Sequence, residues 1–415
     1  EMLESSLNKE NQVDFKDENG HFLDIAEWDG VEFSADGSVV DIFWREGVEA
    51  DELLGNQGDI QLEWLPHSVE LVDFTNRGFG GTLECSKLPT QLIQFYGRNN
   101  RLEGSVDISE LPKNLEYFEV SRNLLSGSVD FQRLPVSLKH LGLFHNVLEG
   151  TIRLSKHAEN FHYLFLGSNK LDGIIEWTEL PRKALRLHFE ENSFHGTVNL
   201  TALPETLHVL RIDDNKFSGS VHLLCLPEAL VELILYGNQF VGTISLVHLP
   251  ETLSEIGLHE NALKGSLDLT HLPSNLTEIL LYQNTFGGTI DLTQLPLNLK
   301  DLYLHENFLE GSIDITHLPK SLDTLSLSTN NFSGTVNLEK LPESLKTLSL
   351  SKNAFSGTVN LEKLPKGLVK IFLNDNRFHG PVDISHLPQT LQIVELSENR
   401  FDKPFSGRLG IVNFG

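Results

Sequence analysis

The sequence predicts a mostly β repeat solenoid of the α/β type with little helix, and three periodic features predict it. Asn recurs fourteen times at an interval of 23 residues, without a slip, from Asn100 to Asn399. Gly lies four residues after the Asn from Gly104 to Gly380. Leu-Pro recurs at the same interval from Leu65-Pro66 to Leu387-Pro388, broken once at His157-Ala158. A fixed period of this length is typical of stacked structural repeats, each of which contacts only its neighbours.

The repeat consensus is LPxxLxxLxLxxNxFxGTVDLxx, present about fifteen times, and each part of it has a physical role. The last two leucines of LxxLxL alternate with variable residues, so they face one side of a short strand. The Asn ends that strand, where its amide can donate to and accept from the buried backbone of neighbouring turns. The Phe or Leu two residues later fills the interior.

The second half of the repeat returns the chain to the next strand. Gly permits a tight bend, and Pro fixes an extended segment. The Val and Leu of TVDL point inward, while Thr and Asp point outward. About six apolar side chains per turn become buried only between neighbouring turns, at ~1.5–3 kcal/mol each, so the stacking of turns dominates stability.

The predicted organisation is an acidic N-terminal cap (residues 1–64), a solenoid of about fifteen repeats (residues 65–401) and a C-terminal tail or cap (residues 402–415). The formal net charge is −26, and residues 1–64 carry −15 of it, from 18 Asp and Glu against 3 Lys and Arg. Such a field argues against nucleic acid and anionic membrane surfaces as partners, and it favours solubility or a basic partner. No uncharged apolar run approaches the roughly 18–20 residues of a membrane helix.

The segment Leu345–Val359, LKTLSLSKNAFSGTV, resembles the leucine-rich repeat superfamily. Its N-x-F/L-S/x-G-T/S-V/I portion is most similar to the plant-type subclass, and Glu27–Trp44 (EWDGVEFSADGSVVDIFW) is similar to the N-terminal cap of that subclass. The resemblance covers residues 65–401 and implies a curved, right-handed superhelix with a parallel sheet on its concave face. The chain looks like a protist-like variant of this type, without cap disulfides.

The two cysteines do not follow the cap of the family. Phe33 stands where that cap has Cys, and no Cys precedes Trp28. Cys85 and Cys225 lie about six turns apart, or about 29 Å, which exceeds the reach of a disulfide. We expect both to be small buried hydrophobes. The missing cap disulfide and the two unpaired cysteines slightly favour an intracellular location, with an extracellular location as the alternative.

The sequence contains no signature of catalysis: no Gly-rich phosphate loop, no nucleophile elbow and no Cys beside a His at one phase of the repeat. We therefore expect no enzyme activity, no cofactor and no metal. A metal site built on His259 and His305 is disfavoured, because two turns, or about 10 Å, separate them. Function is instead expected on the strand positions six, four and two residues before the Asn, where side chains leave the concave sheet.

All six tyrosines occupy these three positions. Tyr is favoured at recognition surfaces, although it also suits strands in general. The first predicted partner-binding cluster is Tyr236, His259, Tyr282 and His305 in one column, Glu232, Glu255, Glu278 and Asp301 in another, and Tyr303 between them. An aromatic stripe beside four carboxylates suits a Lys/Arg-rich segment of a protein partner, through cation–π and ionic contacts. Such a partner would also relieve like charges stacked ~5 Å apart.

A second cluster lies nearer the N-terminus and is aromatic and mildly basic. Its predicted partner-binding residues are Tyr96, Tyr117, Phe144, Tyr163 and Phe165. Exposed Phe144 and Phe165 would indicate a protein contact, unless curvature partly buries them. By contrast, the turns at residues 324–328 and 347–351 present only Ser and Thr, so we expect little binding there.

These observations predict a non-enzymatic protein–protein interaction scaffold that binds its partner through the concave face. One alternative is an extracellular ligand-recognition receptor domain, as the plant-type resemblance implies. Glycosylation at the sequons Asn199, Asn275 or Asn331 would favour it. The other alternative is a purely structural subunit of a larger assembly.

Overall fold

The computed structural model describes residues 7–45, 55, 57–156, 158–402, 406–407 and 412–413. Parts of the predicted cap and most of the predicted tail lie outside these residues. The chain forms two compact units, which we describe one at a time. Unit 1 comprises Glu1–Gly196 and Pro204–Lys216, and unit 2 comprises Thr197–Leu203 and Phe217–Gly415.

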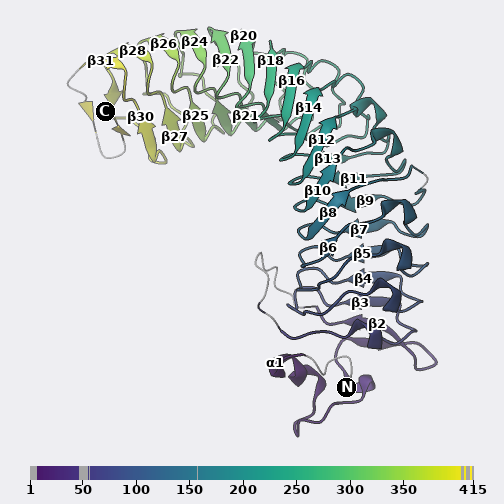
Figure 1. Cartoon of the computed structure of the whole chain (residues 1–415). Helices are drawn as coiled ribbons and strands as arrows, with labels where there is room; N and C mark the ends of the chain where they lie inside the picture. Colours follow the sequence, from purple (N-terminus) through teal and green to yellow (C-terminus); the bar gives the residue numbers. More distant parts are fainter. Residues whose placement is uncertain are drawn as a thin grey trace. The chain divides into compact units, whose positions relative to one another are not determined.

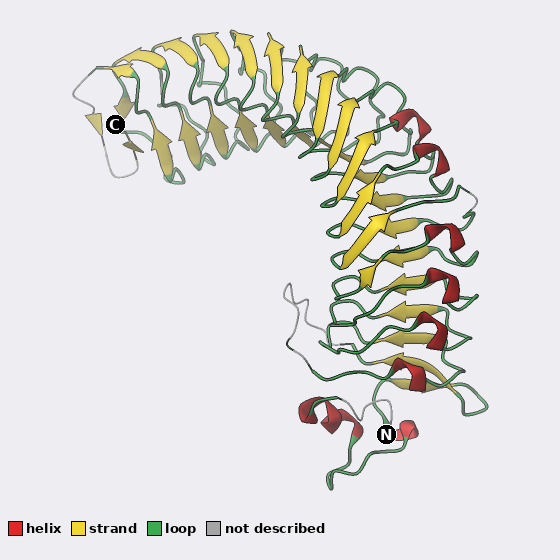
Figure 2. Cartoon of the chain, in the orientation of Figure 1, coloured by secondary structure: helices red, strands yellow, loops and turns green. Residues whose placement is uncertain are grey.

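In unit 1, each turn of the chain adds one strand to a parallel sheet, which we call the first sheet (Figures 1 and 2). Its strands are β2 (Val39–Phe43), β3 (Leu71–Asp73), β4 (Gln94–Tyr96), β5 (Tyr117–Glu119), β7 (His140–Gly142), β9 (Tyr163–Phe165), β11 (Arg186–His188) and β13 (Val209–Arg211). The cap adds β1 (Val31–Phe33), antiparallel to β2. A second parallel sheet contains β6 (Ser126–Gly127), β8 (Val147–Thr151), β10 (Lys170–Gly173) and β12 (Ser193–Thr197).

Unit 2 repeats this arrangement and adds further strands to a first and a second parallel sheet. Its first sheet contains β15 (Glu232–Ile234), β17 (Glu255–Gly257), β19 (Glu278–Leu280), β21 (Asp301–Tyr303), β23 (Thr324–Ser326), β25 (Thr347–Ser349), β27 (Lys370–Phe372), β30 (Ile393–Glu395) and β33 (Val412–Asn413). Its second sheet contains β14 (Lys216–Ser220), β16 (Gln239–Thr243), β18 (Ala262–Gly265), β20 (Thr285–Gly288), β22 (Phe308–Gly311), β24 (Asn331–Gly334), β26 (Ala354–Gly357), β28 (Arg377–Gly380) and β31 (Arg400–Phe401). A short pair, β29 (Asp383–Ile384) and β32 (Ser406–Gly407), is also parallel.

Helix is scarce in the described part of the chain. It consists of α1 (Lys9–Gln12) and single 3₁₀ turns at Val13–Phe15, Ile25–Glu27, Leu62–Trp64, Cys85–Lys87, Ile108–Glu110, Phe131–Arg133, Trp177–Glu179 and Leu200–Ala202. The predicted solenoid with parallel sheets and little helix is therefore confirmed. The predicted boundaries at residues 64 and 401 remain a prediction.

The core follows from the repeat. In the three-residue strands from β3 to β30 of the first sheet the middle residue is buried, and in several of them, such as β19 and β21, both neighbours are half-buried. The Phe two residues after the repeat Asn forms a buried stack, with Phe332, Phe355 and Phe378 separated by 6.1 and 6.2 Å between ring centroids. Each turn thus covers the apolar side chains of the turn before it.

The residue just before each repeat Asn has a left-handed backbone, which the consensus did not indicate. These residues include Glu306, Thr329 and Lys352, with φ of 54°, 53° and 53°. Left-handed backbone is uncommon outside Gly and costs a non-Gly residue roughly 1–2 kcal/mol. The hydrogen bonds of the following Asn hold the chain in this conformation.

Candidate partner-binding site

The sheet face is our name for the side chains that leave the first sheet six, four and two residues before each repeat Asn. In unit 2, four of these side chains form one continuous stack of rings. The centroids of Tyr236 and His259 lie 4.2 Å apart, those of His259 and Tyr282 4.2 Å, and those of Tyr282 and His305 4.4 Å. The ring planes differ by only 14°, 18° and 9°. The spacing of parallel strands, about 4.8 Å, sets this separation.

The stack restricts the cation–π contact that the sequence suggested. Both faces of His259 and of Tyr282 are covered by neighbouring rings, so these two rings present their edges outward. Tyr303 lies outside the stack, with its plane at 61° to Tyr282 and 68° to His305. A cation requires a ring face, and Tyr303 does not lie parallel to any ring of the stack.

Burial makes the histidines of the stack poor bases. His259 is 5% exposed, and its burial lowers the pKa to about 4, with a smaller contribution from His305. Burial also lowers the pKa of His305, whose Nδ1 lies 3.2 Å from the Ser326 hydroxyl. At neutral pH His259 is therefore an uncharged ring. Tyr282 lies between the two histidines, which removes the possibility that they share one metal ion.

The four carboxylates predicted to form a ladder do so. Parallel pairing aligns Glu232 with Glu255, Glu255 with Glu278, and Glu278 with Asp301. Burial raises the pKa of Glu278, and the nearby charges of Asp301 and Glu232 raise it further. The ladder thus carries the like-charge repulsion that a cationic partner would reduce.

Unit 1 gathers most of the second cluster around His140. The His140 ring lies 6.0 Å from Tyr117, 5.9 Å from Tyr163 and 5.3 Å from Phe165. The Tyr96 hydroxyl donates to Gln94 Oε1 at 3.0 Å. Of the two possibilities left open for Phe144 and Phe165, exposure or partial burial, the structure shows partial burial: both are half-buried, because aromatic neighbours pack against them.

Two nearly buried Glu–His pairs flank these rings, and sequence reasoning missed both. His140 Nε2 lies 2.8 Å from Glu119 Oε2, and hydrogen bonds from His140 and Ser121 hold the pKa of Glu119 below its usual range against the effect of burial. A Cβ on Gly142 would fall 1.9 Å from that Glu119 oxygen. The absence of a side chain at Gly142 therefore makes room for the pair.

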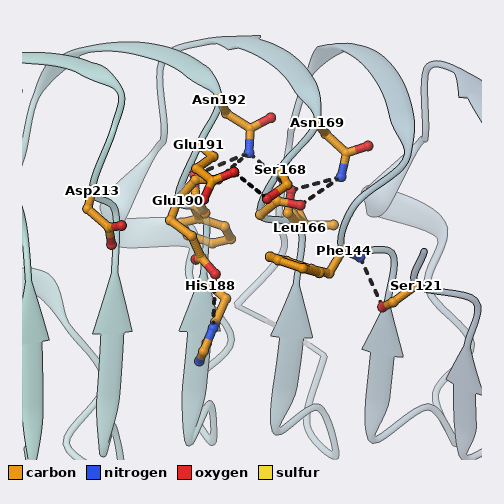
Figure 3. Close-up of polar contacts among 12 residues, drawn as sticks. Ser121, Phe144, Leu166, Ser168, Asn169, His188, Glu190, Glu191, Asn192 and Asp213 are labelled. Carbon is orange, nitrogen blue, oxygen red and sulfur yellow. Dashed lines mark hydrogen bonds and ion pairs between the residues drawn. The ribbon is translucent and has the colours of Figure 1, made fainter. Parts of the chain in front are cut away.

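The second pair joins His188 and Glu190, with 3.3 Å between Nδ1 and Oε1 (Figure 3). Gly167 makes room for it, since a Cβ there would lie 2.7 Å from the Glu190 carboxylate. The sequence did contain a signal for both pairs: Gly142 and Gly167 each lie at the same repeat position as the Glu of the pair, one turn away. Figure 3 also shows the Asn192 amide reaching the carbonyl of Leu166 on the preceding turn, at 3.0 Å.

Cys225 corrects another expectation. Cys85 is buried, as expected, and burial raises the pKa of its thiol to about 12. Cys225 is exposed, because it lies two residues after the buried Leu223, at the repeat position that the exposed His248 and His271 occupy on the next turns. Both cysteines are free.

Within the described residues, no three His, Cys, Asp or Glu side chains lie together in a way that could hold a metal ion. No helix in this part of the chain has both the length and the apolar character needed to cross a membrane.

The sequence matches no protein-family model and no curated protein. Solved structures are similar in fold. A structure of a TDR receptor has a TM-score of 0.65 and 23% identity, over 88% of this chain and 68% of that one. The Arabidopsis receptor kinase HAESA, in complex with the peptide hormone IDA and the co-receptor SERK1, has a TM-score of 0.65 and 21% identity, over 96% and 77%. YopM from Yersinia enterocolitica has a TM-score of 0.53 and 25% identity, over 81% and 75%.

Proposed function

Because this chain is a leucine-rich repeat solenoid, we propose that it is a non-enzymatic binding scaffold that takes a protein partner on its sheet face, the face predicted to be concave. Proteins with this fold include receptor ectodomains, and HAESA was solved with a peptide hormone and a co-receptor. That likeness supports a binding role, and the side chains of this chain supply the rest of the argument.

The observation that carries the proposal is the pairing of the ring stack with the carboxylate ladder in unit 2. The two features follow the same four turns, and Tyr303 lies between them on β21. Half-buried aromatic rings and crowded carboxylates are costly on a surface that meets only water. A partner that covers the rings and brings positive charge would reduce both costs.

The partner we propose is a protein with a Lys/Arg-rich segment. Its cationic groups would pair with Glu278 and Asp301, and one of them would lie over the face of Tyr303. Apolar parts of the partner would cover the ring edges of the stack. The aromatic cluster around His140 in unit 1 is a further contact surface in this proposal.

Binding of a fluorescent Lys/Arg-rich peptide, compared with an acidic peptide of equal length, tests the charge preference. We expect the variant E278Q/D301N to bind the basic peptide at least about tenfold more weakly and with a smaller salt dependence, because two ion pairs are lost. The triple variant Y236A/Y282A/Y303A should also bind weakly. The matched control T347A/S349A/S351A, on turns with only small polar side chains, should bind as the wild type does.

Chemical crosslinking in native extract followed by mass spectrometry would identify the partner. Crosslinks should concentrate on Lys residues near the sheet face. Retention of the native partner by the triple Tyr variant, with the fold confirmed by circular dichroism, would remove the sheet face from the proposal.

A further inference from the structure

The second sheet of unit 2 carries a modification sequence that partner binding does not use. The residues Asn331-Phe332-Ser333 begin β24 and alternate in exposure: Asn331 and Ser333 are exposed, and Phe332 is fully buried. Asn-x-Ser is the acceptor sequence of N-linked glycosylation. Among the described residues, the Asn331 side chain makes no hydrogen bond, so its amide nitrogen is open to modification.

The other two sequons use their side-chain amides in the fold. Asn275 Nδ2 donates to the carbonyl of Glu251 on the preceding turn, at 2.8 Å. Asn298 makes the same contact with Ser274 one turn later, so this is a structural position of the repeat. Asn199 Oδ1 accepts from the backbone N–H of Thr201 and caps a 3₁₀ turn. Asn331 differs from both because, among the described residues, neither the oxygen nor the nitrogen of its side-chain amide makes a hydrogen bond.

Asn331 lies between an exposed aromatic side chain and small side chains, so a bulky group attached to it has both space and an apolar surface to contact. Asn331 pairs with Glu310 of β22, so Phe308, two residues earlier on the same outward face, lies diagonally beside it. Diagonal neighbours in a sheet lie about 7–8 Å apart. Phe308 is 59% exposed, an unusual state for a Phe. On the other side, β26 places the small side chains of Ala354 and Ser356 next to Ser333.

We propose that Asn331 carries an N-linked glycan whose first N-acetylglucosamine packs against Phe308. The sugar would come from a lipid-diphosphate-linked oligosaccharide. The Nδ2 nitrogen forms a bond to the anomeric carbon, the bond from that carbon to the phosphate oxygen breaks, the lipid diphosphate leaves and the amide loses one proton. The C–H face of the sugar then removes the apolar surface of Phe308 from water. Because the glycan lies on the second sheet, the sheet face stays open to a partner.

Peptide mapping of the protein purified from its native source tests the proposal. Treatment with peptide N-glycosidase should lower the intact mass and convert Asn331 to aspartate, a gain of about 1 Da that marks a formerly glycosylated side chain. The Asn275 peptide should show no such gain. An unmodified Asn331 on the native protein overturns the proposal.

Matched variants, secreted from a eukaryotic host, separate the site from the fold. N331Q and S333A each destroy the acceptor sequence at an exposed position, and both should lose the glycan mass. N275Q should keep it. If only N275Q loses the glycan mass, the glycan is attached to Asn275 and not to Asn331, and the proposal is overturned.

The proposed contact between the sugar and Phe308 is tested separately, by the change in melting temperature when the glycan is removed. Enzymatic removal of the glycan should lower the melting temperature of the wild type, because Phe308 becomes exposed again. In Phe308→Ala the glycan remains on Asn331, but its removal should leave the melting temperature unchanged. An equal loss in both proteins would rule out packing of the sugar on Phe308. This result does not depend on whether the sheet face binds a partner.

Discussion

The side-chain amide of Asn284 donates a hydrogen bond to the carbonyl oxygen of Leu258, 2.9 Å away on the preceding turn. The same amide donates to the carbonyls of Leu281 and Tyr282 in its own turn. Its Oδ1 accepts from the backbone N–H of Leu263 at 3.0 Å. One buried side chain therefore satisfies backbone groups of two successive turns, and repeat Asn residues along the described chain make the same contacts.

Replacement of Asn284 by Ala should lower the free energy of unfolding by about 3 kcal/mol or more, because several buried backbone groups lose their partner. Urea unfolding followed by circular dichroism measures the loss. The control is Asn331→Ala in protein made without glycosylation, which should change stability by less than about 0.5 kcal/mol because that side chain is exposed. Similar losses in both variants would contradict the role of the Asn ladder.

Thr329→Gly should stabilise the protein by about 1 kcal/mol. Thr329 is exposed and has a φ of 53°, a conformation that is costly for a β-branched residue and free of strain for Gly. Thr335→Gly is the matched control: Thr335 is also exposed but has no positive φ, so Gly should destabilise by roughly 0.5–1 kcal/mol. Changes of the same sign at both positions would show that the left-handed conformation carries no strain.

The two cysteines should react with iodoacetamide at very different rates. Burial raises the pKa of the Cys85 thiol to about 12, so almost no thiolate is present at pH 8, while Cys225 is exposed. Mass spectrometry should find one fast modification in the native protein and two after unfolding in urea. Cys225→Ser should abolish the fast modification. Rapid labelling of native C225S would show that Cys85 is accessible.

Acid should destabilise unit 2 through His259. In the unfolded chain this His binds a proton near pH 6.5, but burial lowers the folded pKa to about 4. The unfolded state therefore binds more protons between these values, and stability falls as the pH drops from 6.5 to 4, by about 2 kcal/mol from this group. His259→Phe keeps a ring in the stack and should reduce this loss, as measured by urea unfolding at a series of pH values.

Tyr282→Phe is the control for the acid experiment, because it keeps His259 buried in the stack and removes no group that titrates between pH 4 and 6.5. Its loss of stability in acid should match that of the wild type. If H259F and the wild type lose the same stability, the buried ring is not the source of the acid sensitivity.

Most of the fold and part of the site could be predicted from the sequence. The period of 23 residues, the strand before each Asn and the inward Phe and Leu are all confirmed. The alignment of Glu232, Glu255, Glu278 and Asp301 was also predictable, since equal spacing places equal phases side by side in a parallel sheet. The exposure of Cys225 was also predictable, because Cys225 shares its repeat position with His248 and His271, which are exposed as well. The aromatic contacts that half-bury Phe165 were not predictable, because they depend on the side chains of neighbouring turns.

The sequence by itself determined which side chains share a column, because stacking turns of equal length leaves one register. Only the tertiary structure decided how those side chains use the space. Tyr236, His259, Tyr282 and His305 turn their faces to one another because strand spacing nearly matches ring thickness, and Tyr303 stays outside this stack. Glu119 bends over Gly142 because the next turn leaves that volume empty. Such choices depend on contacts between residues about 23 positions apart, which the residues of one turn do not specify.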